Sequence, residues 1–287
     1  MDEYRSTYPV WKICHALEVS KSGYYSWKRR PKSHRSIDND NLLIEIKQIF
    51  AEHNSNYGSP RIYNALWKAD ITCSLNRVAR LMRKDNLVAV HKRKFRATTN
   101  SRHNWPVAPN LLQRNFITDK PNKIWVSDIT YIWTWEGWLY LAFVLDLYYR
   151  GVVGLAMSEN ITDELTQNAL KQAVMRHNPP EGLIHHSDRG SQYASGDYQE
   201  LLKKYQIIPS MSRKGDCWDN AVGESFVHTL KVEKINRYRF KTREEAKREI
   251  FEYAEIYYNR KRAHSSLGYM SPFEFEKQFF TSLQTVH

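Results

Sequence analysis

The stretch Lys123-Ile-Trp-Val-Ser-Asp-Ile-Thr-Tyr-Ile132 is an apolar run that alternates in the manner of a β-strand. A second apolar run covers residues 137–149, and the short link Trp135-Glu136-Gly137 between the two runs is suited to a hairpin. A third strand is expected at residues 152–158. The second half of the chain is therefore predicted to begin with three consecutive antiparallel strands.

Helices and strands alternate after these three strands. A helix is predicted from Thr162 or Asp163 to about His177, where Pro179-Pro180 ends it. The remaining elements are a strand at 182–187, a helix at 196–205, a strand at 206–211, a helix that carries Glu224 and a helix at 242–258. This order is typical of a ribonuclease-H-like fold. We therefore predict an α/β protein whose mixed sheet is covered by flanking helices.

The N-terminal part of the chain shows helical periodicity instead. Ser59-Pro60 is typical of a helix start, and a second helix follows a turn at residues 71–74. The outer face of that second helix carries four basic residues, Arg77, Arg80, Arg83 and Lys84. A helix–turn–helix with a basic second helix is typical of proteins that read the major groove of DNA. An ordinary helical hairpin with a solvated face is the alternative.

The net charge of +12 is unevenly distributed. Residues 1–120 hold 22 Lys and Arg against 10 Asp and Glu, whereas residues 121–287 hold 21 of each. The run His91-Lys-Arg-Lys-Phe-Arg96 adds Lys92, Arg93 and Lys94 to the candidate DNA-binding residues. This asymmetry indicates a nucleic-acid-binding part on a nearly neutral body, and a solubilising surface charge is the alternative.

These patterns divide the chain into four segments. They are a basic helical DNA-binding region with a helix–turn–helix at 1–96, a linker at 97–122, a ribonuclease-H-like core with a C-terminal helical extension at 123–276, and a tail at 277–287. No run approaches the roughly 18 consecutive apolar residues of a membrane span, and the N-terminus does not resemble a secretory signal. We expect a cytoplasmic, nucleoid-associated protein without a membrane partner.

Three acidic residues lie where phosphodiester chemistry would need them. Asp128 lies inside the first strand, Asp188 ends the run that begins at Gly182, and 35 residues separate Asp188 from Glu224, which starts a helix. Two divalent ions roughly 3.5–4 Å apart stabilise the attacking and leaving oxygens of a phosphodiester, and carboxylates hold such ions. Taken singly, each acid is also consistent with a turn or a helix cap.

Spacing alone does not select these acids, because Asp146, Asp197, Asp216 and Asp219 lie close by. The surrounding sequence is more specific, and its informative stretches are Trp125-Val-Ser-Asp-Ile-Thr-Tyr-Ile132, Gly137-Trp-Leu-Tyr-Leu-Ala-Phe-Val-Leu-Asp-Leu147, His186-Ser-Asp-Arg-Gly-Ser-Gln-Tyr193, Ser210-Met-Ser-Arg-Lys-Gly215, Asp219-Asn-Ala-Val-Gly-Glu-Ser-Phe226, Tyr258-Asn-Arg260 and His264-Ser-Ser-Leu-Gly268. Together they resemble the integrase-core transposases of bacterial insertion sequences, a group that also includes retroviral integrases. The chain is most similar to the OrfB-type protein of the insertion-sequence-three family.

The resemblance implies a DNA transposase of the DDE type, in which Asp128, Asp188 and Glu224 are the catalytic metal ligands and Asp146 lies outside the triad. Two Mg²⁺ ions are expected, and Mn²⁺ should be able to replace them. The implied reaction is cleavage at the element's end, followed by attack of the freed 3′-hydroxyl on target DNA. The implied partners are double-stranded DNA, as element ends and as target, further copies of the chain, and an upstream helix–turn–helix protein as a fusion or partner.

Several residues near the acids are further candidates. Lys231 and His228 share a helix face with Glu224, so Lys231 is expected to contact a phosphate, and His228 to contact a phosphate or orient a ligand. Arg213 and Lys214 open a loop before Glu224 and are candidate DNA contacts. Arg237, Arg239, Lys241 and Arg243 form a second basic stretch. Trp133, Trp135 and Trp138 are interpreted as core or interface aromatics, and platforms on which bases stack are the alternative.

Two other functions are open. The motif His186-Ser-Asp-Arg189 fits the His-x-x-Arg pattern of a tyrosine recombinase, and 18 tyrosines are available as nucleophiles. No flanking sequence supports that short match. A non-catalytic DNA-binding regulator of transposition is the other alternative, because acids can persist in a protein that needs a partner.

Overall fold

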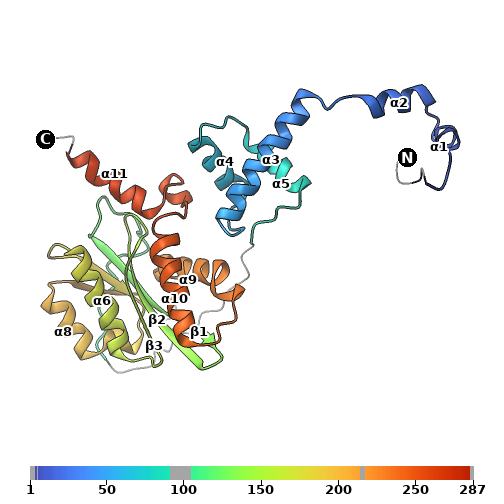
Figure 1. Ribbon diagram of the computed structural model, residues 1–287. Helices are drawn as coiled ribbons and strands as arrows, with labels where there is room; N and C mark the ends of the chain where they lie inside the picture. Colours follow the sequence, from blue (N-terminus) through green and yellow to red (C-terminus); the bar gives the residue numbers. More distant parts are fainter. Residues whose placement is uncertain (1–3, 5, 91–104, 214–216, 285–287) are drawn as a thin grey trace.

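The computed structural model describes residues 4, 6–90, 105–213 and 217–284 (Figure 1). The second half of the chain forms a five-stranded sheet in the order β3-β2-β1-β4-β5. The strands are β1 (Ile124–Thr134), β2 (Gly137–Asp146), β3 (Val152–Ser158), β4 (Ile184–Ser187) and β5 (Ile208–Met211). β2 is antiparallel to both β1 and β3, whereas β4 is parallel to β1 and β5. The predicted mixed sheet of a ribonuclease-H-like fold is therefore confirmed.

Helices cover both faces of the sheet (Figure 1). One layer consists of α6 (Asp163–His177) and α8 (Gly196–Lys204), with the short α7 (Ser191–Ala194) before α8. The other layer consists of α9 (Ala221–Glu233) and α10 (Arg243–Phe251). Gly154 allows α6 to lie close to β3, because a Cβ at this position would be 2.2 Å from the carbonyl oxygen of Ala169. The close approach of this helix therefore requires a glycine.

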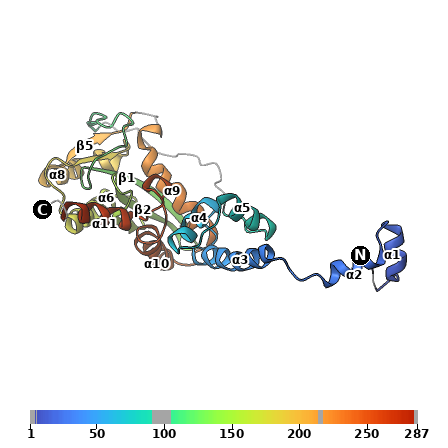
Figure 2. The same ribbon diagram turned by 90° about the horizontal axis from the view of Figure 1, so that it is seen from above.

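The N-terminal region is helical, as predicted. Helices α3 (His34–Glu52), α4 (Ser59–Lys68) and α5 (Leu75–Lys84) pack around their own buried core, which includes Ile46, Leu66 and Val78. The hydroxyl of Ser74 caps α5 by accepting a hydrogen bond from the backbone N–H of Arg77 at 3.3 Å. Helices α1 (Val10–Ala16) and α2 (Lys21–Arg29) lie away from the rest of the molecule in both views (Figures 1 and 2).

The three-helix unit is fixed to the C-terminal part of the chain through Tyr57. The buried Tyr57 hydroxyl accepts a hydrogen bond from the backbone N–H of Ala263 at 2.8 Å. The same hydroxyl donates to the carbonyl oxygen of Lys261 at 3.2 Å. The ring of His53 stacks on Tyr57, with 3.7 Å between ring centroids. The two hydrogen bonds join residues that lie 204 and 206 positions apart in the chain.

The last part of the chain differs in detail from the predicted elements. Its elements are the 3-10 helices η2 (Cys217–Asn220), η3 (Ile235–Arg237) and η5 (Ser265–Leu267), the π-helix η4 (Glu252–Tyr258), which continues α10 without a break, and α11 (Pro272–Gln284). The predicted helix at 242–258 is thus α10 followed by a wider π-helical turn. Helix α11 continues past residue 276, the predicted end of the core, to Gln284.

Of the two places expected for the hairpin tryptophans, core or interface, the structure excludes the core. Trp133, Trp135 and Trp138 at the β1–β2 hairpin are exposed, so none of them belongs to the core. The hairpin extends beyond the helices that cover the sheet, and nothing in the described part of the chain buries these rings. Separately, none of the described helices is both long and apolar enough to cross a bilayer.

Candidate active site

The strand register brings the two candidate aspartates to the same level. β1 and β4 are parallel neighbours, and Val126 pairs with His186. Asp128 and Asp188 each follow two residues later in their own strand direction, so the register extends from one pair to the other. Asp128 lies in the middle of β1, and Asp188 comes directly after β4. Both residues are half-buried.

Helix α9 brings the third acid to this place. Asp128 lies opposite Phe143 in the β1–β2 pair, and the ring of Phe143 packs on Phe226 with 4.6 Å between centroids. Phe226 is buried on α9, and Glu224 lies two residues before it in the first turn of the same helix. Packing of α9 on the sheet therefore positions Glu224 near Asp128.

The charges of the other two acids act on Asp128. Burial raises the pKa of Asp128 well above its usual value, and the negative charges of Asp188 and then Glu224 raise it further. The backbone N–H of Ile129, which donates to Asp128 Oδ1 at 2.8 Å, lowers this pKa, as does Lys231. Burial also raises the pKa of Glu224. The site therefore holds negative charge that a cation would compensate.

Lys231 extends the site along α9. Its ammonium lies 4.6 Å from the ring centroid of Tyr131, which is a cation–π contact, and burial lowers the pKa of Lys231. Asp128 opposes this decrease, so Lys231 is within electrostatic reach of the acids. His228 lies one turn beyond Glu224 on α9 and is half-buried. Both residues share the helix that carries Glu224, as the sequence predicted.

A divalent cation fits the chemistry of this donor set. The hydroxyl of Tyr193 is buried and has no hydrogen-bond partner within the described part of the chain. Burial raises the pKa of Tyr193 well above its usual value, and the charges of Asp128 and Asp188 add to the shift, which places this hydroxyl close to both acids. Among residues 4, 6–90, 105–213 and 217–284, no three His, Cys, Asp or Glu side chains are close enough together to enclose an ion. The carboxylates supply hard oxygen donors, but the three of them do not surround a common position at which an ion would be enclosed.

The other acids that lie close to the triad in the sequence do not join it in the described part of the chain. Asp146 is fully buried, and its carboxylate accepts hydrogen bonds from the backbone N–H groups of Asn122 and Tyr148 and from the indole of Trp125. Burial raises the pKa of Asp146 to about 6 despite these donors. Asp197 lies exposed in the first turn of α8. Asp216 lies outside the described residues. Asp146 and Asp197 therefore do not point to a metal site.

Asp219 anchors the segment that precedes the Glu224 helix. Its buried carboxylate accepts from both Nε and Nη2 of Arg213, at 2.9 Å each, and from Nε of Arg114 at 3.1 Å. The Arg213 side chain lowers the pKa of Asp219 below its usual range. His186 fixes the backbone of the same residue, because its Nε2 lies 2.9 Å from the Asp219 carbonyl oxygen. Arg213, a candidate DNA contact, therefore already has an intramolecular partner.

The basic residues of α5 differ in their surroundings. Arg77 is half-buried, and its Nε donates to Oδ1 of Asn39 on α3 at 2.8 Å. Arg80, Arg83 and Lys84 are exposed. Lys92, Arg93, Lys94 and Lys214 lie outside the described residues. Arg80, Arg83 and Lys84 are thus the residues of this helix that are open to a ligand.

Sequence reasoning missed two features of the site: the ring of Tyr131 and the anchoring role of Asp219. Tyr131 lies three residues after Asp128, and side chains an odd number of positions apart point to opposite faces of a strand, so the pattern provided no reason to group them. Tyr193 was not missed, because the sequence predicts a loop of residues 190–193 beside the substrate. The partners of Asp219 come from distant parts of the chain.

Comparison with known proteins shows the family of both parts of the chain. Residues 118–217 and 205–272 each match a family described as Integrase core domain, and residues 37–95 match the family described as HTH-like domain. The chain is 48% identical over 267 residues to the "Insertion element IS600 uncharacterized 31 kDa protein" of Shigella sonnei, and the match covers 93% of this chain and 98% of that protein.

A second relative carries a functional name. The chain is 39% identical over 280 residues to "Transposase InsF for insertion sequence IS3A" of Escherichia coli (strain K12), and the match covers 97% of each protein. Among solved structures, the catalytic core domain of BIV integrase is similar at a TM-score of 0.43 and 18% identity, covering 57% of this chain and 99% of that one. The chain belongs to the integrase-core transposases of the IS3 insertion-sequence family.

Proposed function

We propose that the chain is a metal-dependent polynucleotidyl transferase that cuts the ends of its element and joins them to target DNA. In the first step, the oxygen of a water molecule bonds to phosphorus while the bond from phosphorus to the 3′-oxygen breaks, which leaves a 3′-hydroxyl and a 5′-phosphate. In the second step, that 3′-oxygen bonds to a target phosphorus and the target's own 3′-oxygen leaves. A proton is lost from each attacking group and gained by each leaving oxygen.

The convergence of Asp128, Asp188 and Glu224 beside Lys231 supports this proposal most strongly. Asp128 and Asp188 would hold Mg²⁺, or Mn²⁺ in its place, and Glu224 would complete the ligand set. The ions would supply charge stabilisation for both reacting oxygens and a more acidic nucleophile. Lys231 would contact a phosphate oxygen next to the acids. Asp219 and Arg213 would act indirectly, by holding the segment that leads into α9.

A cleavage and joining assay tests this function. Labelled duplexes that carry the element's end are incubated with the full chain and Mg²⁺, with and without the upstream helix–turn–helix protein. We expect a nick at the element's end that depends on the divalent ion, followed by joined products. Dependence on the upstream protein would show that this partner is needed. Absence of nicking under both conditions, with DNA binding intact, would contradict the proposed reaction and favour a non-catalytic regulator.

We predict that the reaction leaves no protein covalently attached to DNA, because water and the 3′-hydroxyl are the only nucleophiles. A tyrosine recombinase would need His186 and Arg189 at the phosphate. Both ring nitrogens of His186 instead face protein groups, Ser210 and the Asp219 carbonyl, and Arg189 Nε donates to the Ser212 carbonyl. Denaturing gels of stalled reactions should show only free DNA ends. A DNA-linked protein band that one Tyr→Phe substitution removes would contradict the metal mechanism.

We also propose that the helix–turn–helix region binds duplex DNA through α5. Replacing Arg80, Arg83 and Lys84 together by Ala in the full chain should weaken duplex binding and make it less sensitive to salt. Removal of each side chain that neutralises a phosphate should reduce the log–log slope by roughly 0.9. Fluorescence anisotropy over a range of salt concentrations measures this slope.

The matched control for that experiment is the exposed pair Lys203 and Lys204 on α8, at the other end of the molecule (Figure 1). Replacing this pair by Ala should leave the slope nearly unchanged. Loss of preference for the element's end in the α5 variant would indicate base reading, and a uniform loss would indicate phosphate contact. Equal slopes for the wild type and the α5 variant would contradict a DNA-binding role for this helix face.

We further propose that the chain acts on DNA as a homo-oligomer.

A further inference from the structure

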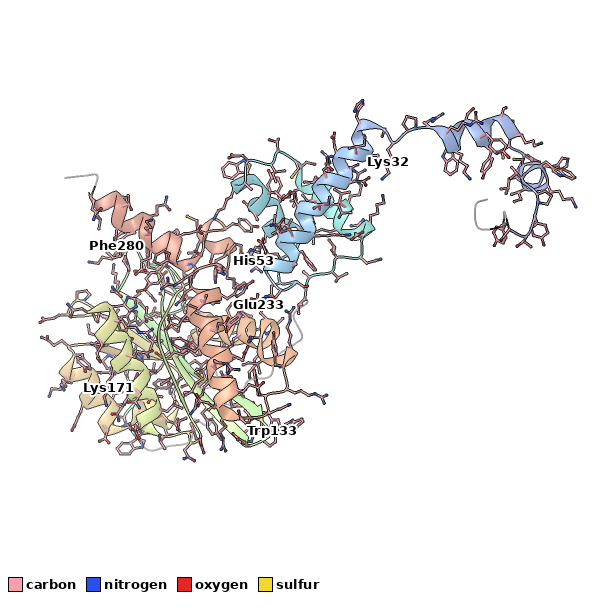
Figure 3. The ribbon with its side chains drawn as sticks, viewed as in Figure 1. Lys32, His53, Trp133, Lys171, Glu233 and Phe280 are labelled. Atoms are coloured by element: carbon pink, nitrogen blue, oxygen red, sulfur yellow. The ribbon has the colours of Figure 1, made fainter. Side chains whose placement is uncertain are left out.

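The β1–β2 hairpin carries four aromatic rings that the fold leaves uncovered. We call Tyr131, Trp133, Trp135 and Trp138 the hairpin cluster. Trp133, Trp135 and Trp138 are 56%, 69% and 43% exposed. The rings of Trp133 and Trp138 meet edge-to-face at 4.8 Å between centroids, and those of Tyr131 and Trp138 at 5.2 Å. These contacts join the rings of Tyr131, Trp133 and Trp138, and Figure 3 shows Trp133 at the end of the hairpin.

A basic segment lies along the edge of this hairpin. Thr134 at the end of β1 pairs with Phe240 in a parallel bridge, and the backbone N–H of Trp135 donates to the Phe240 carbonyl at 3.1 Å. Phe240 is buried under the sheet. Because side chains alternate along an extended chain, Arg239 and Lys241 point to the opposite side from Phe240, which is the side of Trp133. Both Arg239 and Lys241 are exposed.

The acids beside the cluster already accept hydrogen bonds. Arg243 binds two of them, because its backbone N–H donates to Glu136 at 2.7 Å and its Nη1 donates to Glu159 at 2.9 Å. Glu245 accepts from the backbone N–H of Lys241 at 2.7 Å. Among these contacts, only the Arg243–Glu159 contact joins opposite charges, so a ligand on this face would meet the guanidinium of Arg239 and the ammonium of Lys241 beside the hydrogen-bonded carboxylates of Glu136 and Glu245. The surface therefore combines flat aromatic rings with positive charge.

The cluster is continuous with the candidate active site. The Lys231 ammonium lies over Tyr131, a member of the cluster, and it acts on the pKa of Asp128. At roughly 3.3 Å per residue of strand, the five positions from Asp128 to Trp133 span roughly 17 Å. Stacked nucleotides repeat at roughly 3.4 Å along one strand, so this distance corresponds to roughly five nucleotides.

We propose that the hairpin cluster, together with Arg239 and Lys241, binds an unpaired stretch of DNA strand that leads away from the reacting phosphodiester. This inference rests on the proposed function only for the position of that phosphodiester. Indole rings stack on any base whose face is free, and basic side chains follow the phosphates. In a duplex the neighbouring base pairs cover those faces, so the rings favour unpaired bases. A two-fold contact with a second copy would instead bring Arg239 and Lys241 of both copies onto the same patch.

Binding of oligothymidylate to the full chain tests this proposal. An oligomer of about twelve nucleotides is suitable, since single-strand sites span roughly 4–16 nucleotides. Anisotropy is measured with a chelator present, so the result does not depend on cleavage. Replacing Trp133 and Trp135 together by Ala should raise the Kd for the oligomer roughly tenfold or more, given the size of base–aromatic stacking. Phe at the same two positions should recover most of the affinity.

Two further variants and a duplex substrate make the test more specific. Arg239→Ala with Lys241→Ala should weaken oligomer binding and make its salt dependence shallower. Phe280→Ala on α11 is the matched control, because Phe280 is 45% exposed and lies far from Trp133 (Figure 3), and it should change nothing. Duplex binding should be similar in all variants. Circular dichroism verifies that each variant is folded.

Two results would overturn the proposal. One is an oligomer affinity that is undetectable in the wild type or equal in the wild type and the folded Trp133→Ala/Trp135→Ala variant. The other is a Trp133→Ala/Trp135→Ala variant that binds oligothymidylate like the wild type but no longer self-associates in sedimentation. That result would assign the face to a second copy of the chain. If the acidic triad is wrong but these binding results hold, the proposed chemistry fails and the strand-binding surface remains.

Discussion

Changing Asp128 to Asn, Asp188 to Asn or Glu224 to Gln should each lower the rate of DNA cleavage by about a thousandfold or more. Each substitution keeps the shape of the side chain and removes the charge that holds a divalent ion. Metal ions contribute several kcal/mol of transition-state stabilisation, and 1.36 kcal/mol corresponds to a tenfold change in rate. Single-turnover cleavage of a labelled element end in Mg²⁺ measures the effect. Near wild-type activity for any one variant would remove that residue from the triad.

The same variants should keep their fold. The pKa of Asp128 is raised in the folded state, so at neutral pH its ionised form destabilises the protein relative to the unfolded chain. Asp128→Asn removes that charge and its repulsion with Asp188, so the melting temperature should be unchanged or higher. Asp197→Asn is the matched control, because Asp197 is an exposed acid on α8, and it should keep full activity. A triad variant that lost activity by unfolding would not support the assignment.

Arg262→Met should lower the free energy of unfolding by about 3–5 kcal/mol, because it leaves Glu233 buried without its cation. Nη2 of Arg262 donates to Glu233 Oε1 at 2.7 Å and Nε donates to Oε2 at 2.8 Å. The hydroxyl of Tyr253 donates to the same carboxylate at 2.9 Å, and Arg61 of α4 lies 3.9 Å from it. Glu233 ends α9, the helix that begins next to Glu224, and lies between the N-terminal helices and α10 (Figure 3).

Urea unfolding of the full chain measures this effect. Lys123→Met is the matched control, because the Lys123–Asp119 pair at 2.8 Å is exposed, and it should not move the midpoint measurably. Replacing both buried partners, in Arg262→Met/Glu233→Leu, should recover much of the loss, because neither member of the buried pair is then left without the other, and Arg61 keeps its hydrogen bond to the carbonyl oxygen of Asn56. An Arg262→Met variant as stable as the wild type would mean that water reaches Glu233. Loss of activity together with stability would link this ion pair to the position of Glu224.

Local pattern was sufficient for the strands of the sheet, whereas the choice of the three acids also needed the family resemblance. The alternation around Asp128 predicted β1, and the apolar run before Asp188 predicted β4. Their adjacency followed from the order of elements, and the choice of Glu224 over nearby acids followed from the family resemblance. The helix–turn–helix was visible from Ser59-Pro60 and the basic face that follows the turn. For the strands and the helix–turn–helix the information lies within a few neighbouring residues, whereas the resemblance that selected the acids rests on stretches between residues 125 and 268.

Contacts between distant segments were not predictable in this way. The Tyr57 hydroxyl forms hydrogen bonds with the backbone of Lys261 and Ala263, and Glu233 pairs with Arg262. These contacts join positions that share no periodicity in the sequence. The alternation of β1 could not show that Lys231 reaches Tyr131 on the other face of the strand. Composition also could not show which apolar residues the helices leave uncovered. The sequence therefore left open whether Trp133, Trp135 and Trp138 lie in the core or at an interface.

Binding of Mn²⁺ to the full chain in complex with its element end tests the central claim most directly. Electron paramagnetic resonance of free Mn²⁺ measures the affinity, and Mn²⁺ accepts the carboxylate ligands that suit Mg²⁺. We predict that Asp128→Asn/Asp188→Asn lowers this affinity roughly tenfold or more, while Asp197→Asn leaves it unchanged. Equal Mn²⁺ affinities for the wild type, the control and the double variant, all bound to DNA, would contradict a metal site at Asp128, Asp188 and Glu224.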